Sequence, residues 1–421
     1  MSRLVGIAGI YDIARDVGSA LFVQQYGGIH SCGVYTKDNH GVVYGRKDTG
    51  LISHKISSSD FDLLSGCLGI GHISSLDNDV QPYEVINQKL GETIIVCGDC
   101  TKDLFEKMCS CLEHAKGKLV TVLYNWMKKN FGPFAFLVLS GNKIYALRGD
   151  GRKPLCFGSL EENKGFIIAS QQNAINSIGG NLIKHIEPGE IIVFDNTEYD
   201  SNIVVAIKRC IREIIFGQSP ASRWGKSESQ GLRIRMGEAL GRRIKQNVDI
   251  IYPVPYGGNA YAQGVYREIS NRYKSKEENK IVTYNPGGFT KNFYPRLPGM
   301  RLNTFLSLTN EEEVCGRKIV IVNDTLRSGE EILYLVQRCR QAKAQEIHIG
   351  VACLQLFNCP YGGEIPAVLM GVEKTYSEIA KALNADTFCA LTMSMICRAI
   401  NVPEYIFCAE CLRNHKPLAV V

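Results

Sequence analysis

The sequence contains a pair of cysteines and a glycine-containing loop whose residue types and spacing could support ligand binding or catalysis. Cys408 and Cys411 form a C-x-x-C pair in FCAECL (407–412), a pattern that binds metal ions or performs thiol redox chemistry. In KIVIVNDTLRSGEEI (318–332), an apolar stretch leads into a polar loop that contains Gly329. Because N–H groups at the start of a helix attract anions, such a loop can hold a phosphate group.

The N-terminal half reads as short strands separated by glycines. From Leu4 to about Asp195, short apolar segments recur at regular spacing, which predicts a β-rich core with helices at 102–116 and 118–130. The predicted strands are VGIAGIY, GVVYG, LGIGHI, TIIVCG, FAFLVLS, KIYALRG, FIIAS and EIIVFD. We therefore expect a layered, strand-rich domain over residues 1–196.

The pattern changes after Asn196. A basic and polar stretch leads to a helical pattern at 231–246, and the apolar strands DIIYPVP, KIVIVND and EIHIGVACL follow, with the helical segment EEILYLVQRCRQA between the last two. Strands that alternate with helices predict a parallel α/β sheet. We expect a linker over 197–227, which carries Cys210, and a second domain over 228–421.

Several segments, in order along the chain, resemble the glutamine phosphoribosylpyrophosphate (PRPP) amidotransferases, also called amidophosphoribosyltransferases. They include GIGHISSLDNDVQPY (69–83), ALRGDGRKPLCFG (146–158), IIASQQNAINSIGG (167–180) and HIEPGEIIVFD (185–195). The resemblance extends from about Leu4 to Leu412. It implies an N-terminal nucleophile-hydrolase αββα sandwich, as in class II glutamine amidotransferases, joined to a phosphoribosyltransferase-type parallel α/β domain.

The resemblance also locates a glutaminase site whose residues differ from those of the family. The family's C-G-I-x-G begins with the cysteine that attacks glutamine, and the matching position in VGIAGIY is Val5, which has no nucleophile. The arginine of the family's G-H-x-R, which grips the substrate carboxylate, is Ser74 here. The asparagine and glycine of the oxyanion hole match Cys97 and Gly98, so one donor is missing. Cys32 matches a structural alanine. We therefore expect no glutaminase activity.

The loop at 318–332 resembles the family's PRPP signature D-D-S-x-x-R-G-T-T but departs from it. Glu330 and Glu331 replace two threonines and would repel a phosphate, although they would also stabilise the first turn of a helix. The resemblance implies an impaired PRPP site, with Mg²⁺ only where PRPP is bound. The expected remnant of the site comprises Asn323, Asp324, Thr325, Ser328, Gly329, Glu330 and Glu331, the glycines Gly257 and Gly258 of VPYGGNAYAQG (254–264), and Lys291 of TKNFYPRLPGMRL (290–302).

Four cysteines match the thiolates that hold a four-iron, four-sulfur cluster in iron–sulfur members of the family. They are Cys210 in CIREIIFGQSPAS, Cys359 in LFNCPYGGEIP, and the pair Cys408 and Cys411. Four thiolates suit a [4Fe–4S] cluster or tetrahedral zinc, and the third alternative is that these cysteines only pack in the interior. The resemblance implies a structural cluster that ties three regions of the sequence together.

Composition limits the classes of partner. The 421 residues are 45% hydrophobic but contain no apolar run long enough to span a bilayer, so we expect a cytoplasmic protein without a membrane partner. The net charge of +6 is spread without long blocks of like charge, so we expect no nucleic-acid partner.

These observations favour a catalytically degenerate amidotransferase homologue of the type used in purine biosynthesis. It would act as a regulatory or assembly partner of an active paralogue or within a homo-oligomer. One alternative is an ammonia-dependent or repurposed phosphoribosyltransferase that binds a nucleotide or a phosphoribosyl ligand. The other is an iron–sulfur sensor of oxygen or redox state.

Overall fold

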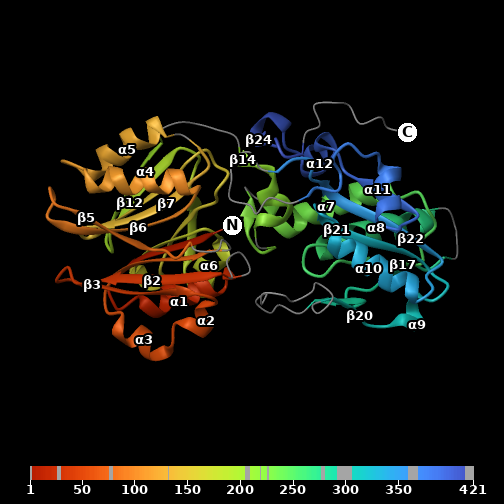
Figure 1. Cartoon of the computed structure of the whole chain (residues 1–421), viewed down its shortest axis with the longest axis horizontal. Coiled ribbons are helices and arrows are strands. Elements are labelled where there is room, and N and C mark those ends of the chain that lie inside the picture. The colour runs from red at the N-terminus through yellow and green to blue at the C-terminus, as the bar shows by residue number, and fades with distance from the viewer. Residues whose placement is uncertain are drawn as a thin grey trace. The chain divides into compact units, whose positions relative to one another are not determined.

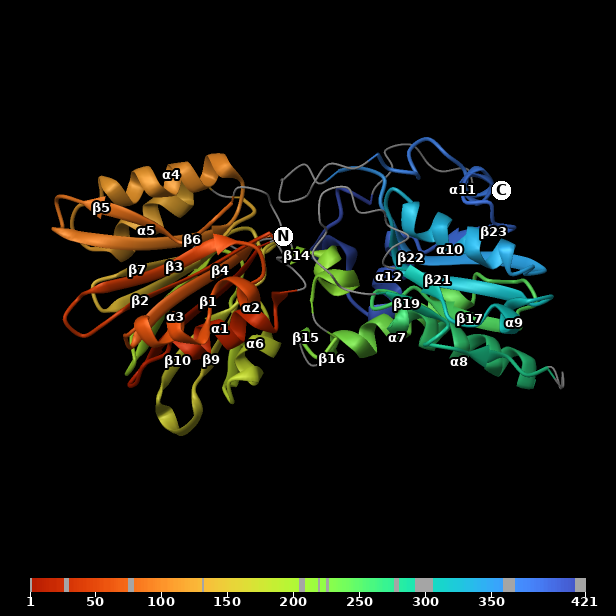
Figure 2. The ribbon, with the colours of Figure 1, turned by 60° about the horizontal axis from the view of Figure 1, so that its bottom comes forward.

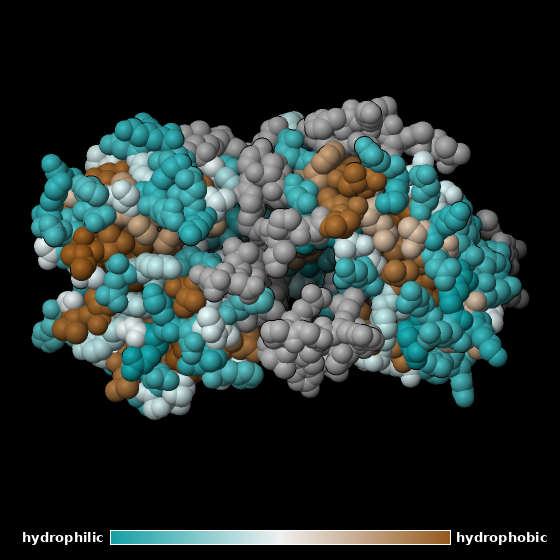
Figure 3. Space-filling view, in the orientation of Figure 1, coloured by the Kyte–Doolittle hydropathy of each residue, from teal (hydrophilic) through white to brown (hydrophobic). Residues whose placement is uncertain are grey.

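A computed structural model describes residues 2–25, 30–74, 79–130, 132–203, 209–218, 220–224, 227–275, 280–291, 306–358 and 368–412. Contacts between Cα atoms divide the chain into two compact units, of which the first ends at Cys210 and the second begins at Ile211. Residues 197–210 of the expected linker thus fall in the first unit and residues 211–227 in the second. On the face drawn in Figure 3, hydrophilic residues predominate and hydrophobic residues form separate patches.

The first unit contains two antiparallel sheets (Figure 1). The seven-stranded sheet has the order β11-β9-β10-β1-β4-β2-β3, and the six-stranded sheet has the order β13-β12-β8-β7-β6-β5. The strands of the first sheet are β1 (Arg3–Gly9), β2 (Ser31–Lys37), β3 (Val43–Thr49), β4 (Leu68–Ser74), β9 (Cys156–Ser159), β10 (Gly165–Ala169) and β11 (Asn181–His185). Those of the second are β5 (Tyr83–Asn87), β6 (Glu92–Asp99), β7 (Ala135–Ser140), β8 (Lys143–Arg148), β12 (Glu190–Phe194) and β13 (Tyr199–Ile203).

Helices cover the outer faces of both sheets, which gives four layers (Figure 2). The seven-stranded sheet is covered by α1 (Ala14–Phe22), α2 (Ile52–Lys55), α3 (Ser58–Leu63) and α6 (Gln172–Ser177), and the six-stranded sheet by α4 (Lys102–Glu113) and α5 (Leu119–Lys129). A short 3-10 turn, η2, spans Glu161–Asn163. Side chains of β1 alternate, since Leu4 and Ala8 lie in the cluster between the sheets, whereas Val5 and Ile7 face the helices. The predicted αββα sandwich is confirmed.

The predicted helices at 102–116 and 118–130 are confirmed, but five strands were missed. These are β2, β5, β9, β11 and β13. The reason differs between them: β13 (YDSNI) is an edge strand with mostly exposed side chains, whereas β2 (SCGVYTK) is fully buried although four of its residues are polar or glycine. In both cases pairing with neighbouring strands, and not the apolar pattern, determines the strand.

The second unit is built on a parallel sheet of five strands in the order β18-β17-β21-β22-β23. They are β17 (Ile250–Pro253), β18 (Thr283–Tyr284), β21 (Lys318–Leu326), β22 (Glu346–Leu354) and β23 (Thr387–Ala390). The helices are α7 (Ser229–Gly241), α8 (Asn259–Ser275), α9 (Glu311–Val314), α10 (Glu330–Gln341), α11 (Tyr376–Ala382) and α12 (Met393–Ile400). The predicted parallel α/β sheet is confirmed.

Short elements complete the described chain. They are β14 (Arg209–Cys210), η3 (Glu213–Gly217), β15 (Arg223–Trp224), β16 (Ser227–Glu228), β19 (Phe289–Lys291), β20 (Leu306–Leu308), η5 (Glu404–Ile406) and β24 (Phe407–Cys408). One buried cluster of the second unit joins the sheet to α7, α8 and α12, and another joins it to α10 and α11. Among the described helices, none is long and apolar enough to cross a membrane.

Candidate functional site

Val5, the residue predicted at the nucleophile position, lies in the middle of a buried sheet. In β1 it pairs with Gly71 of β4 on one side and with Ala169 of β10 on the other. Its side chain is fully buried in the apolar cluster between this sheet and its helices. Cys32 lies in the same cluster, where burial raises the pKa of its thiol to about 11. Both side chains therefore contribute to packing.

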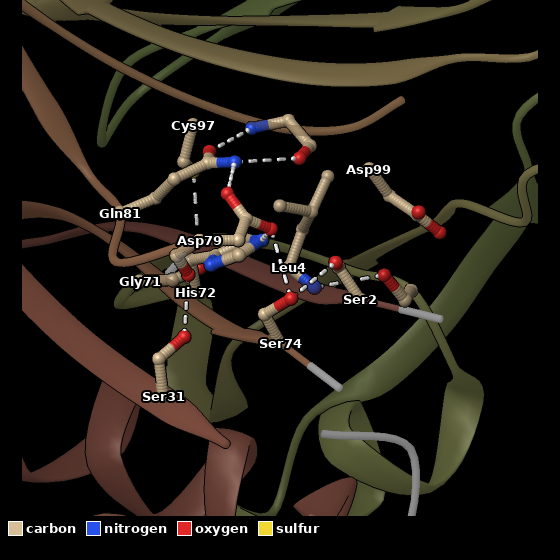
Figure 4. Close-up of polar contacts among 12 residues, drawn as sticks. Ser2, Leu4, Ser31, Gly71, His72, Ser74, Asp79, Gln81, Cys97 and Asp99 are labelled. Atoms are coloured by element: carbon tan, nitrogen blue, oxygen red, sulfur yellow. Dashed lines mark hydrogen bonds and ion pairs between the residues drawn. The ribbon is translucent and has the colours of Figure 1, made fainter. Parts of the chain in front are cut away.

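A buried polar network surrounds Ser2, which immediately precedes β1 (Figure 4). The Ser2 hydroxyl lies 3.2 Å from the Ser74 hydroxyl, which donates to Asp79 Oδ2 at 2.8 Å. Strand register explains the first contact, because Arg3 pairs with Ile73 and so sets residue 2 opposite residue 74. The exposed fractions of Ser2 and Ser74 are 2% and 0%. The side chain at position 74 therefore meets residue 2 and not the middle of β1.

Gln81 connects this network to the strand that carries Cys97 and Gly98. Its Nε2 donates to Asp79 Oδ1 at 2.7 Å, and its Oε1 accepts from the Gly98 N–H at 2.7 Å (Figure 4). The backbone donor predicted for the oxyanion hole is therefore engaged within the protein. Cys97 is fully buried, and burial raises the pKa of its thiol far above the usual range. Its side chain is thus a neutral core group and supplies no amide donor.

Three titratable side chains lie beside the network. Lys153 Nζ donates to Asp99 Oδ1 at 2.7 Å, and both residues are less than 10% exposed. Burial would raise the pKa of Asp99, but the Lys153 ammonium and other nearby positive charges, including Arg3, together lower it. Burial lowers the pKa of His72, so its ring is neutral at pH 7. Within the described chain neither nitrogen of that ring has a hydrogen-bond partner, and Nε2 lies 3.9 Å from Asp79 Oδ2.

The family motif C-G-I-x-G fits the sequence in two registers, and the structure favours the earlier one. In VGIAG the motif keeps both of its glycines, Gly6 and Gly9, which favours Val5 when only the sequence is considered. In SRLVG the motif runs from Ser2 to Gly6, with a hydroxyl in place of the thiol. Because Ser74 meets Ser2, while Val5 faces apolar side chains, the contacts favour Ser2 over Val5 as the match to the nucleophile position. The signal missed in the sequence was a nucleophilic residue type four positions before Gly6.

In the second unit, the two predicted phosphate loops meet at the carboxyl edge of the sheet. β17 and β21 are parallel neighbours, so the loops that follow them lie side by side. A Cβ atom on Gly257 would lie 2.5 Å from Asp324 Oδ2, and a Cβ atom on Gly258 would lie 2.2 Å from the carbonyl oxygen of Val322. Only glycines permit so close an approach, and the structure thus brings Gly257, Gly258 and Asp324 together.

Charged side chains occupy the start of α10. Gly329 has a φ of +79° directly before the helix, and Glu330 and Glu331 form its first turn. Lys291, on β19, donates from Nζ to Glu331 Oε1 at 2.6 Å. Ser328 is partly exposed in the preceding turn. The predicted anion site is therefore lined by acidic side chains, one of which pairs with the nearby lysine.

Asp324 is the carboxylate with the most unusual environment in these loops. Burial raises its pKa to about 6, the Arg233 guanidinium opposes this increase, and the Glu331 carboxylate adds to it. Its neighbour Asn323 donates from Nδ2 to the carbonyl of Thr325 at 3.2 Å, and Thr325 pairs with β22. The acid pair of the family is thus one acid and one amide, and the remaining acid carries part of a proton near neutral pH.

The predicted metal ligands are described only in part. Cys359 lies outside the described residues, as do residues 292–302 of the segment that carries Lys291. Cys210 ends β14 in the first unit, Cys408 ends β24, and Cys411 is 5% exposed. Among the described residues, no group of three or more His, Cys, Asp or Glu side chains is placed to hold a metal ion.

Chain segments next to these cysteines nevertheless converge within the second unit. The carbonyl of Cys411 accepts hydrogen bonds from the N–H groups of Leu356 at 2.9 Å and Phe357 at 3.1 Å, so the C-x-x-C pair adjoins the segment that leads to residue 359. Ile211, which follows residue 210, shares a buried cluster with Phe407 and other side chains near the pair.

Two guanidinium groups lie near this convergence. Burial and repulsion from Arg212 lower the pKa of Arg327, while the Cys411 side chain opposes the decrease. Positive charges of this kind favour thiolates over thiols. The donor type and the local charge therefore fit a thiolate-bound metal group.

The fold and the two sites define a class of protein: a sandwich like that of class II glutamine amidotransferases, followed by a phosphoribosyltransferase-type α/β unit. No family model matches the sequence. Curated amidophosphoribosyltransferases are similar to the chain over nearly its whole length. The protein from Methanocaldococcus jannaschii is 25% identical, and the match covers 99% of this chain and 98% of that protein. The protein from Pyrococcus horikoshii is 27% identical, and the match covers 97% of this chain and 98% of that protein.

Solved structures agree on the fold. The glutamine PRPP amidotransferase from Bacillus subtilis, complexed with ADP and GMP, is 19% identical with a TM-score of 0.85, covering 100% of this chain and 98% of that one. A structure described as the allosteric regulatory enzyme of purine biosynthesis gives the same identity and TM-score, covering 100% and 97%. The chain is therefore a homologue of the amidophosphoribosyltransferases, and the predicted resemblance is confirmed.

Proposed function

We propose that this amidophosphoribosyltransferase homologue does not hydrolyse glutamine and acts as a regulatory or assembly partner, of an active paralogue or within its own oligomer. The observation that carries the proposal is the closed hydrogen-bond network from Ser2 through Ser74, Asp79 and Gln81 to Gly98. Every group that would meet a substrate amide in this network already has a partner within the protein. The network is therefore complete without glutamine.

The chemistry of the individual residues supports the same view. A serine hydroxyl has a much higher pKa than a thiol, so Ser2 needs an efficient base, and its oxygen is almost fully buried. Ser74 is too short and carries no charge to grip a carboxylate. Cys97 replaces an oxyanion donor whose loss alone costs roughly 100- to 1,000-fold in rate. Together these changes disfavour formation of the acyl-enzyme at several points.

A glutaminase assay tests the first half of the proposal. The full-length chain, with and without PRPP, is incubated with glutamine, and glutamate is measured beside the Ser2→Ala variant. We expect no glutamate above background from either protein. Glutamate production by the unaltered chain that disappears in Ser2→Ala would refute the proposal, because the activity would then arise at residue 2 and not from a contaminant.

A mixing experiment tests the second half. The chain is purified alone and together with an active amidophosphoribosyltransferase from the same source, and the mass of the complexes is measured by analytical ultracentrifugation. We expect either mixed complexes with altered amidotransferase activity or a stable homo-oligomer. A monomer that forms no mixed species and leaves the activity unchanged would exclude the partner role.

We also infer that Cys210, Cys359, Cys408 and Cys411 hold a [4Fe–4S] cluster, with zinc as the alternative. The hydrogen bonds from Leu356 and Phe357 to Cys411, together with the nearby arginines, support this inference. When bound, the group would link chain segments and stabilise the fold. Anaerobic purification followed by iron, zinc and sulfide analysis tests this inference, and we expect about four irons per chain. The irons should be lost in Cys411→Ser. They should remain in Cys315→Ser, a control that removes an exposed thiol. Absence of both metals would refute it.

A second candidate function is an ammonia-dependent or repurposed phosphoribosyltransferase. The close packing of Gly257 and Gly258 on the strand that carries Asp324 supports it, because this contact is retained although the neighbouring loop has become acidic. Release of pyrophosphate from PRPP, Mg²⁺ and ammonium by the unaltered chain, and its loss in Asp324→Asn, would favour this function. If calorimetry at millimolar PRPP also gives no binding, the candidate fails.

A further inference from the structure

A basic groove lies between α7 and α12 in the second unit. The two helices pack together (Figures 1 and 2), and a cavity of about 610 Å³ lies along them. Arg242, Arg243 and Lys245 line it from the end of α7, and Arg398 lines it from α12. None of the lining residues belongs to the phosphate loops or to the Ser2 network. The groove is therefore separate from the sites described above.

Most of the positive charge in this groove is uncompensated. Of the four basic side chains in the groove, Arg242 has an acidic partner among the described residues, because its Nε lies 3.4 Å from Glu268 Oε2. Arg243 lies instead beside Met395, with Nη1 3.6 Å from the sulfur. Lys245 and Arg398 are exposed to solvent, and Arg398 donates only to the carbonyl of Ser394, at 3.4 Å. An anion in the groove would thus meet three cations without carboxylates.

The rest of the lining is apolar. Ala239 comes from α7, and Met395 and Ala399 come from α12. Small pockets that bind metabolites typically have a volume of roughly 300–1,000 Å³ and combine apolar walls with a few polar groups. We propose that the groove binds a small organic phosphate, with the phosphate on Arg243, Lys245 and Arg398 and the carbon skeleton on the apolar wall.

Helix electrostatics alone does not account for the arrangement. Cations near the end of a helix are favourable, which explains Arg242 and Arg398 individually. Lys245 lies beyond the end of α7, and the helix dipole provides no reason for a concave apolar wall beside it. The seven lining residues are also few compared with the roughly 20–30 residues that each partner contributes to a standard protein interface. A small anionic ligand fits these features best.

Calorimetry on the full-length chain at low salt tests the proposal, with inorganic phosphate and phenyl phosphate as probes. The two probes share the phosphate group and differ in the apolar part. Lys245→Ala/Arg398→Ala removes two groove cations, and Arg235→Ala/Lys381→Ala is the matched control, because it removes two exposed cations that do not line the groove. Lys291→Ala reports any binding at the phosphate loops.

We expect phenyl phosphate to bind several-fold more tightly than phosphate, and the groove variant to weaken both by roughly 10-fold or more. The control and Lys291→Ala should stay within about twofold of the unaltered chain. No binding of either probe at about 10 mM, or equal losses in the groove variant and its control, would overturn the proposal. A loss that occurs only in Lys291→Ala would assign the binding to the phosphate loops and overturn it as well.

Discussion

The Ser2 network and the phosphate loops differ in how their polar groups are satisfied. Around Ser2, the Ser74 hydroxyl and the Gln81 amide both donate to the Asp79 carboxylate, and the buried pair Asp99–Lys153 balances its own charges. In the phosphate loops, Asp324 is partly buried and forms no ion pair among the described residues, and burial raises its pKa to about 6 although Arg233 opposes the increase. The first site is therefore self-sufficient, whereas the second retains a carboxylate in an unfavourable environment.

This difference indicates two ways in which a fold can hold buried polar side chains. A site filled with mutually bonded side chains gains stability and excludes a ligand. A site that keeps an unfavourable charge gains nothing in stability, which is typical of residues that meet a ligand. If the comparison is right, substitutions in the first site should destabilise the protein, and removal of the Asp324 charge should stabilise it.

The largest effect is expected from Lys153→Met. This change leaves the Asp99 carboxylate buried and unpaired, and breaking a buried pair costs roughly 3–5 kcal/mol. Urea unfolding followed by Trp126 fluorescence in a Trp224→Phe background measures the free energy of unfolding of the first unit, since the chain has two tryptophans. Asp62→Asn is the control, because the Arg15–Asp62 pair is more than half exposed and should be worth at most about 1 kcal/mol. Equal effects of the two would show that burial of the pair is unimportant.

Val5→Ala should give the next largest effect, about 2 kcal/mol. It removes two methyl groups from the cluster between the seven-stranded sheet and its helices and leaves a small cavity. The same unfolding assay measures it, beside Val42→Ala, whose side chain is 48% exposed and should contribute little. A neutral Val5→Ala would contradict the placement of residue 5 in the packed core and would reopen its assignment to the nucleophile position.

Sequence reasoning predicted the fold more fully than the sites. The layers of both units follow from apolar strands and helices of ordinary length, so their order could be predicted from periodicity alone. The register of β1 could not, because two glycine spacings fit the family motif, and only pairing with β4 places residue 2 opposite Ser74. Nor could the sequence predict that Gln81 engages the Gly98 N–H, since that contact depends on a loop bringing together residues 17 positions apart.

Asp324→Asn should stabilise the second unit at neutral pH. The carboxyl pKa is about 6 in the folded chain and about 3.9 when unfolded, so between these values the unfolded state releases its proton first and stability falls as pH rises. The variant lacks this loss, and its advantage should grow from nearly zero at pH 4 to about 2 kcal/mol at pH 7. Unfolding followed by Trp224 in a Trp126→Phe background measures it.

Asp386→Asn is the control of opposite sign. Burial would raise the pKa of Asp386, but hydrogen bonds from the Ile347 N–H and from Arg340 hold it below its ordinary value. Its carboxylate therefore stabilises the fold above the unfolded pKa, and this contribution is lost as pH falls. Asp386→Asn should thus be least stable, relative to the unaltered chain, at pH 7. If Asp324→Asn behaved in the same way, Asp324 would be a stabilising charge and the contrast between the two sites would fail.

The smallest effect is expected from Ser2→Ala, at most about 1 kcal/mol. Among the described residues, the Ser2 hydroxyl contacts one other side chain, that of Ser74, and Ser74 keeps its shorter bond to Asp79 when residue 2 is changed. Ser59→Ala is a matched control, because within the described part of the chain the exposed Ser59 hydroxyl contacts Ser57 alone, and its removal should be neutral. A loss above about 2 kcal/mol would mean that Ser2 anchors the whole network. A gain in stability would instead mean that Ser2, like Asp324, lowers the free energy of unfolding. Such a residue would point to ligand binding at the start of β1.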